Sequence, residues 1–320
     1  MQEYVINSHI YLQANKEYWG TKPQIENLQF KVMDEPAQIV NAIQAGTIDV
    51  ATVLSSDIDF VKTLPEYSVK LLSSGSTDAV WFNTTTTSIF NNRDARKAVC
   101  HAVNRESVVT LAYFGYATIP SWPLPMNYVD YDPKFSTLDD TYTVGYDVEL
   151  AKQYADKGGL TGKDVRIATN GSSTSVTMAE VIQQNLRDIG VNATITNYDM
   201  ATWFNITMDT SLYDLFIWSM YSPSFTAAQM YYGWFVYMPC FNQGTWDGID
   251  RFGELANAVE FTFDETERAQ QISELTEILE RESIWYAIDE PQTAVVYNAN
   301  LDGIAFMKGL SAYYGNWSWK

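Results

Sequence analysis

Apolar and polar positions along the chain predict strands interleaved with helices. Residues 3–14 alternate weakly, as two strands joined by a turn would, and residues 28–32 alternate in the same way. Apolar residues at helical spacing predict amphipathic helices within 36–45, 176–189 and 263–283. Strands that alternate with helices indicate the α/β class.

Shorter elements continue the same alternation. Strands are expected at 69–72, 79–82, 165–168, 191–195, 285–288 and 293–297, and helices at 106–113 and 148–157. Asn92 or Asp94 can cap a further helix that runs to His101 or beyond, Asp264 and Glu267 have the spacing of a helix start, and Gly190 is expected to end the helix at 176–189. The Pro-rich stretch 120–134 is expected to be an ordered loop, and the Thr-rich tract 84–88 is a candidate domain boundary.

Composition narrows the class of protein. The 320 residues contain 20 Lys and Arg against 39 Asp and Glu, for a net charge of −19. Such a chain repels the phosphate backbone, which disfavours nucleic-acid binding, and it disfavours docking on an anionic membrane surface. Hydrophobic residues make up 46%, enough for a substantial core. The start of the chain lacks the pattern of a signal peptide.

Candidate catalytic chemistry is sparse. None of the common nucleophile, phosphate-loop, dinucleotide or zinc motifs is present. Cys100 and His101 are adjacent on a predicted helix and diverge, so they are more simply structural than a nucleophile pair. The loop Asn170-Gly171-Ser172-Ser173 could cradle an anion, but a polar loop is the simpler interpretation. Cys100 and Cys240 could form a disulfide if the protein is exported. We therefore expect no enzyme, no cofactor and no metal site.

The most unusual segment is 215–246, which has no charged residue and no His but eleven aromatic rings. Most of these rings are expected in the core, and several are expected to line a ligand cleft. The candidate ligand-binding residues are Trp218, Tyr221, Ser222, Tyr231, Tyr232 and Trp234, with Trp122 in the Pro-rich loop as a weaker candidate.

Six groups of short strings, in the same order between residues 14 and 203, resemble one family. They are ANKEYWG at 14–20, IQAGTID at 43–49, WFN at 81–83, FNNRDARKAV at 90–99, NRESVV at 104–109, and LRDIGV at 186–191 with ATW at 201–203. Together they resemble the bacterial extracellular solute-binding proteins of family 5, the peptide-, nickel- and oligosaccharide-binding receptors of ABC importers.

The resemblance implies an α/β, two-lobed periplasmic-binding-protein-like fold of type II that closes on its ligand by a hinge motion. It also implies that the N-terminal part of one lobe is missing from this chain. Residues 1–82 and 300–320 would form a partial first lobe, and 83–299 a second lobe with the aromatic ligand-facing segment. The hinge crossings would lie near residues 82–83 and 297–298.

One departure from the family matters. Peptide-binding members resemble one another in an acid that follows a Trp and receives the amino terminus of the peptide. If Trp218 matches that Trp, the acid position holds Tyr221; if the whole family string is laid on this sequence without a gap, the acid position holds Pro223. A buried ammonium needs a paired anion. The first hypothesis is therefore a receptor for a neutral or weakly charged solute, and the second is a peptide receptor whose acid comes from elsewhere, such as Asp247, Asp250 or the missing lobe.

The resemblance implies the substrate-capture component of an ABC importer, which binds a peptide or other small uncharged solute in an interlobe cleft without chemistry. An oligosaccharide receptor of the same family is the alternative, and an enzyme of unknown type is a third reading with little support. The implied partners are a small-molecule, peptide or oligosaccharide ligand and the membrane permease of the importer, with no nucleic acid and a monomeric state. The implied location is extracytoplasmic, as a cell-surface lipoprotein or periplasmic protein.

Overall fold

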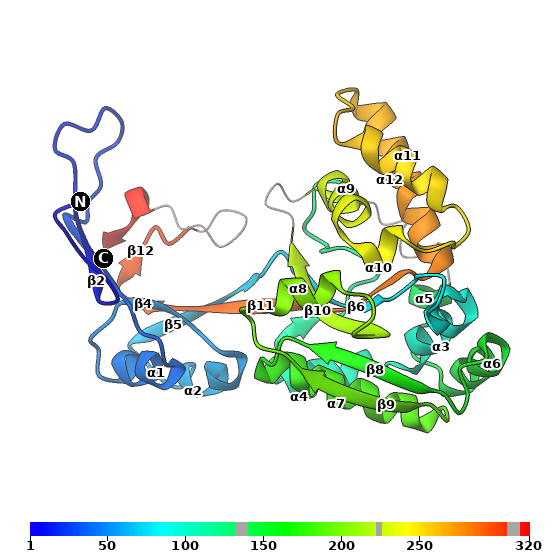
Figure 1. The fold of residues 1–320 in the computed structure, drawn as a ribbon. Helices are drawn as coiled ribbons and strands as arrows, with labels where there is room; N and C mark the ends of the chain where they lie inside the picture. Colours follow the sequence, from blue (N-terminus) through cyan, green and yellow to red (C-terminus); the bar gives the residue numbers. More distant parts are fainter. Residues whose placement is uncertain (132–139, 222–225, 306–313) are drawn as a thin grey trace. The chain divides into compact units, whose positions relative to one another are not determined.

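The computed structural model describes residues 1–131, 140–221, 226–305 and 314–320, and the chain forms two compact units (Figure 1). Unit 1 comprises Met1–Ser74 and Gln292–Lys320, and unit 2 comprises Gly75–Pro291. Both crossings come earlier in the chain than the predicted boundaries at 82/83 and 299/300. Strand pairing explains the difference, because β6 (Ser76–Phe82) pairs along its whole length with β10 (Leu215–Tyr221) of unit 2.

Unit 1 is built from short strands and two helices around a small apolar core. Its elements are β1 (Glu3–Val5), β2 (His9–Gln13), β3 (Asn27–Lys31), α1 (Pro36–Gln44), β4 (Val50–Val53), α2 (Ile58–Val61), β5 (Tyr67–Ser73), the second half of β11 (Trp285–Asn298), β12 (Leu301–Asp302) and β13 (Ser318–Trp319). Strands β1, β2 and β3 form an antiparallel sheet, and β11 lies between β4 and β5. The core is centred on Ile43, Val61 and Val296.

Unit 2 is a mixed sheet with helices packed against it. Besides β6, β10 and the first half of β11, its elements are α3 (Arg93–Ala102), α4 (Arg105–Tyr113), β7 (Ala117–Thr118), α5 (Asp140–Thr143), α6 (Val148–Gly158), β8 (Asp164–Thr169), α7 (Ser173–Asp188), β9 (Asn192–Asn197), α8 (Trp203–Met208), α9 (Ala227–Tyr237), α10 (Pro239–Asn242), α11 (Ile249–Val259) and α12 (Glu265–Glu282).

The strand order β11-β6-β10-β8-β9 brings distant parts of the chain side by side in unit 2. Strand β6 is antiparallel to both of its neighbours, whereas β10, β8 and β9 are parallel. Helix α7 packs on β8, β9 and β10, and α11 and α12 lie together (Figure 1). The alternation of strands with helices predicted from sequence is therefore confirmed, and so is the α/β class.

Local signals placed the helix ends well. The Asn92 side chain accepts a hydrogen bond from the Asp94 amide at the start of α3, at 2.9 Å. Asp264 does the same for the Glu267 amide at the start of α12, also at 2.9 Å. Gly190 follows α7 with a φ of 79°, a conformation that glycine adopts without strain.

The last two predicted strands are one strand in the structure. β11 runs without interruption from Trp285 to Asn298, with an irregular register between Ala287 and Asp289. Pro291 does not break it, because Pro291 pairs with β7, an edge strand only two residues long. The residues between the two predicted strands, 289–292, are therefore paired residues of this same strand.

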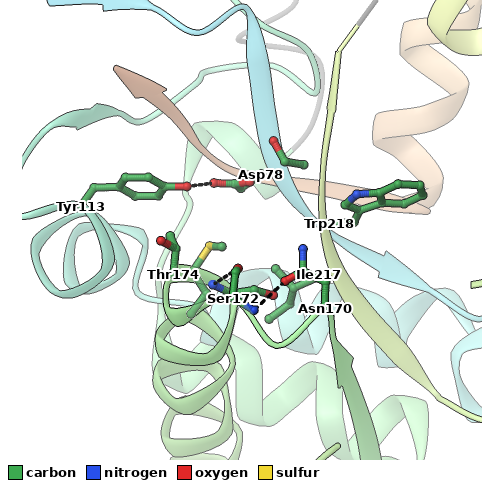
Figure 2. A pocket seen from close by; sticks show the side chains of 10 residues that line it. Asp78, Tyr113, Asn170, Ser172, Thr174, Ile217 and Trp218 are labelled. Carbon is green, nitrogen blue, oxygen red and sulfur yellow. Dashed lines mark hydrogen bonds between the residues drawn. The ribbon is translucent and has the colours of Figure 1, made fainter. Parts of the chain in front are cut away.

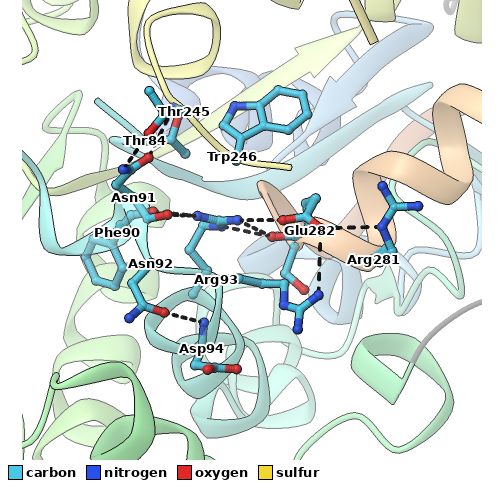
Figure 3. A network of polar contacts seen from close by, with 12 residues as sticks. Thr84, Phe90, Asn91, Asn92, Arg93, Asp94, Thr245, Trp246, Arg281 and Glu282 are labelled. Atoms are coloured by element: carbon cyan, nitrogen blue, oxygen red, sulfur yellow. Dashed lines mark hydrogen bonds and ion pairs between the residues drawn. The ribbon is translucent and has the colours of Figure 1, made fainter. Parts of the chain in front are cut away.

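Arg96 of α3 is fully buried in unit 2 and holds several chain segments together. Its guanidinium donates to the carbonyl oxygens of Phe90 at 2.7 Å, Asn91 at 3.0 Å and Glu282 at 2.6 and 2.9 Å. The buried Glu282 carboxylate also approaches Arg281 and Arg93 (Figure 3). Burial lowers the pKa of Arg96 to about 10, so the side chain stays charged at neutral pH.

Both cysteines are buried thiols that form no disulfide, Cys100 in α3 and Cys240 in α10. Burial raises the pKa of the Cys240 thiol to about 12, which removes the reactive thiolate. We expect Ellman's reagent to modify the native chain very slowly and to titrate both thiols at once in urea. Rapid stoichiometric modification of the folded protein would contradict the burial, and Cys100→Ser and Cys240→Ser variants would show which thiol had reacted.

Candidate functional site

A small open pocket in unit 2 collects side chains from five elements. Its volume is about 240 Å³, and its lining residues are Asp78, Tyr113, Asn170, Ser172, Thr174, Ser175, Met178, Ile217, Trp218 and Ser219. Figure 2 shows Trp218 on β10, Tyr113 on α4, and Ser172 and Thr174 at the start of α7, all around this space. Polar groups and one large ring thus converge on a concave surface, as they do in solute-binding sites.

The β8–α7 loop forms the hydroxyl-rich wall of the pocket. The Ser172 hydroxyl caps α7 by accepting from the Ser175 amide at 3.2 Å, and Asn170 accepts from the Ser172 amide at 3.1 Å. These bonds fix the loop. Ser175 is 4% exposed, and its buried hydroxyl has no hydrogen-bond partner among the described residues. The loop that sequence suggested as a polar turn therefore does line a pocket.

Asp78 supplies the acid of the pocket from the middle of an apolar strand. It is 3% exposed and lies opposite Ser219 of β10 on one side and Asp289 of β11 on the other. Both the Tyr113 hydroxyl, which points at Asp78 in Figure 2, and the Ser219 hydroxyl hydrogen-bond to its carboxylate.

Asp78 and Asp289 are both buried away from water, and this shifts the pKa of each carboxyl. Burial raises the pKa of Asp78, although hydrogen bonds from Tyr113, Asp289 and Ser219 oppose the rise. The pKa of Asp289 is raised well above its usual value, first by burial and then by the Asp78 charge. A protonated Asp289 carboxyl that donates to an ionised Asp78 is the arrangement that these shifts favour.

Trp218 is the predicted ligand-contact residue that the structure places in the pocket. Its ring is half-buried and packs edge-on against Trp203 at 6.3 Å and Phe204 at 6.5 Å between centroids. Its carbonyl accepts a bond from the Trp81 indole. The ring is thus held firmly while part of it faces the pocket.

The other predicted contacts lie elsewhere. Tyr231 and Trp234 of α9 are fully buried, packed on Phe252 and Trp285 respectively, and Trp122 is fully buried beside Tyr131. This is a correction: the apolar faces of α9 and the Pro-rich loop turn inward to fill the core, so these three rings have no surface for a ligand here.

Tyr232 is half-buried against Phe261 at 6.4 Å and does not line the pocket. The Tyr221 main chain pairs with Ser76, but its side chain lies outside the described residues, as does all of Ser222. Their contact with a ligand stays a prediction.

Sequence reasoning missed Asp78, the residue that gives the pocket its charge. The signal was an acid inside a strand of otherwise apolar residues, DAVWF at 78–82, matched by AIDEP at 287–291. Strands buried on both faces seldom hold an acid without a reason. The acids proposed instead, Asp247 and Asp250, are exposed and do not line the pocket.

Two further findings concern metal binding and membrane crossing. Across residues 1–131, 140–221, 226–305 and 314–320, no group of three or more His, Cys, Asp or Glu side chains is placed to hold a metal ion. In those same ranges, no helix combines the length and apolar character that crossing a bilayer requires. The pocket offers hydroxyls, an amide, an aromatic ring and a carboxylate, which suit noncovalent binding.

A mixed α/β unit with a polar, ring-lined pocket is an arrangement that can bind a small solute. The model of the bacterial extracellular solute-binding proteins, family 5 Middle, matches residues 1–238, so the chain belongs to this family. It is 28% identical over 211 residues to the oligopeptide-binding protein AppA of Bacillus subtilis, covering 59% of this chain and 37% of that protein. It is 28% identical over 223 residues to the nickel-binding periplasmic protein of Escherichia coli, covering 61% and 40%.

Solved structures show the same fold. NikA from Brucella suis, in complex with Fe(III)-EDTA, matches 99% of this chain with a TM-score of 0.87 at 19% identity, and 67% of its own chain is covered. AppA from Bacillus subtilis, in complex with a nonapeptide, matches all of this chain with a TM-score of 0.75 at 16% identity, over 65% of its own length. The chain therefore spans about two fifths of its curated relatives and about two thirds of its structural neighbours.

Proposed function

We propose that this chain is part of the substrate-capture component of an ABC importer and binds a peptide or other small solute at the unit 2 pocket without chemistry. The proposal rests on one observation: Trp218, Asp78 and the hydroxyl groups of the β8–α7 loop all line the same pocket. A ring provides apolar contact and polar groups provide orientation, which is how small solutes are recognised. Membership of a family of solute-binding proteins supports the same conclusion.

The proposal also covers the partners, the oligomeric state and the cellular location of the protein. Its partners would be the solute and the membrane permease of the importer, and it would act as a monomer without nucleic acid. The acidic charge of −19 agrees with the last point. Its location would be extracytoplasmic, as a periplasmic protein or a cell-surface lipoprotein.

An oligosaccharide ligand is the second candidate. A half-exposed indole beside several hydroxyl groups can also contact the face of a sugar ring, and this is the observation that favours it. The carboxylate of Asp78 in the same wall favours a solute with hydrogen-bond donors or positive charge.

Binding can be followed by NMR titration of the isotope-labelled chain with tripeptides, their amino-acetylated forms and maltotriose. We expect a saturable shift of the Trp218 indole signal with one solute class and no new products after long incubation. Trp218→Ala, in which the Ser219 amide signal is followed instead, should weaken binding about 2- to 12-fold, since an aromatic contact contributes about 0.5–1.5 kcal/mol.

Trp19→Ala is the matched control, because Trp19 is 91% exposed in unit 1. It should leave the affinity unchanged. If no solute in the panel moves the Trp218 signal, or if a bound solute is turned over, the proposed function is wrong.

A further inference from the structure

The start of α7 brings hydrogen-bond donors to the wall of the pocket. Asn170, Ser172, Thr174 and Ser175 all line this wall. The helix is 16 residues long, so its first turn carries the positive end of a full helix dipole. The Ser172 hydroxyl accepts from the Ser175 amide at 3.2 Å. The amides of Ser173 and Thr174 have no acceptor within the helix, as at every helix start, and are available to an acceptor from outside it.

The Ser175 hydroxyl is a second, independent feature of the same wall. Ser175 is 4% exposed, and its hydroxyl has no hydrogen-bond partner among the described residues. Buried hydroxyls are normally hydrogen-bonded, because burial without a bond costs free energy. An unpartnered hydroxyl in a pocket wall, next to the amides of a helix start, therefore suits a ligand atom that accepts hydrogen bonds.

The loop that carries these donors is held in one conformation. The Gly171 amide donates to the Thr169 hydroxyl at 3.2 Å, and that hydroxyl donates to Asn197 at 2.7 Å. Gly171 has a φ of 73°, and a Cβ there would stand 2.7 Å from the Tyr198 carbonyl oxygen, so the turn requires glycine. Donors that are already in place lose little freedom when a ligand binds, which favours binding.

The charge of the pocket limits which acceptors can bind at the start of α7. Asp78 lines the same small space as Ser172 and Thr174, and none of the lining residues is Lys, Arg or His (Figure 2). Tyr113 and Ser219 hydrogen-bond to the Asp78 carboxylate, which favours its charged form. Two negative charges in one partly buried space repel each other strongly. A carboxylate or phosphate would meet this repulsion, whereas an uncharged oxygen would not.

The remaining lining residues favour a group with carbon atoms behind its oxygen. Met178 and Ile217 are buried apolar residues of the pocket, and Trp218 adds part of its ring. The volume is about 240 Å³, below the range of about 300–1,000 Å³ that is usual for whole-ligand pockets. The pocket therefore suits one functional group of a solute, such as an amide with its neighbouring carbon atoms.

We propose that the first turn of α7 and the Ser175 hydroxyl bind an uncharged carbonyl oxygen of the solute, and that Asp78 keeps carboxylates and other anions from this position. The inference rests on the proposed function and specifies its substrate class: solutes that present an amide or another neutral carbonyl group. The oxygen accepts from the Ser173 and Thr174 amides and from the Ser175 hydroxyl. Asp78 acts here as a determinant of specificity.

The test compares two probes of similar shape and different charge. N,N-dimethylbutyramide has a neutral carbonyl oxygen and no N–H group, so its binding cannot come from donation to Asp78. Butyrate has the same carbon chain with a negative charge. The labelled chain is titrated with each probe at neutral pH and constant ionic strength, and the Ser173 and Thr174 amide signals are followed. We expect a saturable shift with the amide, and binding of butyrate at least about tenfold weaker because of the repulsion.

Two variants assign the effects to single groups. Ser175→Ala should weaken binding of N,N-dimethylbutyramide about 2- to 12-fold, the effect of losing one hydrogen bond. Thr177→Ala is the matched control, because its hydroxyl belongs to the same helix, donates to the Ser173 carbonyl and does not line the pocket. It should bind both probes as the parent chain does. Asp78→Asn should strengthen butyrate binding about tenfold or more, because the repelling charge is gone.

The outcomes separate this inference from the proposed function. The inference is overturned if the amide does not shift the α7 signals saturably, if Ser175→Ala binds it as the parent does, or if the parent binds butyrate equally well. A folded Asp78→Asn variant that still rejects butyrate also overturns it. If circular dichroism shows that Asp78→Asn does not fold, the two probes on the parent chain and on Ser175→Ala still decide. A tripeptide or maltotriose that shifts Trp218 saturably would leave the proposed function standing without this inference.

Discussion

Replacing Arg96 with Leu is expected to lower the free energy of unfolding of unit 2 by about 3–5 kcal/mol, the cost of breaking a buried charged network by removing one partner. The guanidinium is fully buried and satisfies the carbonyls of Phe90, Asn91 and Glu282 at once. Leu offers no donor, so these carbonyls would remain without a partner, and the buried Glu282 carboxylate would lose an ion pair at 3.5 Å. Urea unfolding followed by tryptophan fluorescence measures the loss.

Two variants show whether the hydrogen-bond geometry is responsible. Arg96→Lys keeps the charge but not the planar fork, so it should still lose a large part of the stability. Arg93→Leu is the control, because its side chain is 46% exposed and lies 3.8 Å from Glu282. It should cost under about 1 kcal/mol. A stability of Arg96→Leu close to that of the parent chain would show that the network does not hold unit 2 together.

Asp289→Asn is expected to stabilise the protein at neutral pH and to flatten its dependence on pH. The native pKa of Asp289 is raised, so the folded chain retains a proton that the unfolded chain releases near pH 3.8. Between that pH and the raised native pKa, the folded state binds more protons, and the free energy of unfolding falls as pH rises. Asn cannot ionise, and its amide can still donate to Asp78. The gain should be on the order of 1–3 kcal/mol, because each unit by which the native pKa exceeds the unfolded value costs the folded state about 1.4 kcal/mol above that pKa.

Unfolding curves at about pH 4.5 and about pH 8 bracket the relevant change. The parent chain should lose more stability across this interval than Asp289→Asn. Asp250→Asn should follow the parent, because Asp250 is exposed. Parallel behaviour of the parent chain and Asp289→Asn would mean that the acid pair does not retain its proton in the folded state.

The sequence left two hypotheses, a receptor for a neutral solute and a peptide receptor whose acid lies outside residues 215–246. They differ in whether the pocket contains an acid from another segment. The uncharged wall at 215–246 suggested a neutral solute, and an acid from elsewhere would suggest a charged one. The structure brings Asp78 of β6 beside Trp218 and Ser219 of β10. The uncharged segment therefore supplies one wall of the pocket, and a different strand supplies the charge.

Sequence alone determined the local structure and the family. Apolar spacing predicted α7 and α12, and capping residues such as Asn92 and Asp264 predicted helix starts, because these features depend on neighbours within one or two turns. The short strings shared with solute-binding proteins were sufficient to predict the family, since each depends on local residue order.

Only the tertiary structure decided which side chains meet. Asp78 and Asp289 lie far apart in the chain and become neighbours because β6 pairs with β11. The same packing turns Tyr231 and Trp234 inward and leaves part of Trp218 facing the pocket, although all three belong to one aromatic segment. Strand order and the facing of a ring depend on contacts between distant segments, and residue type and spacing do not specify those contacts.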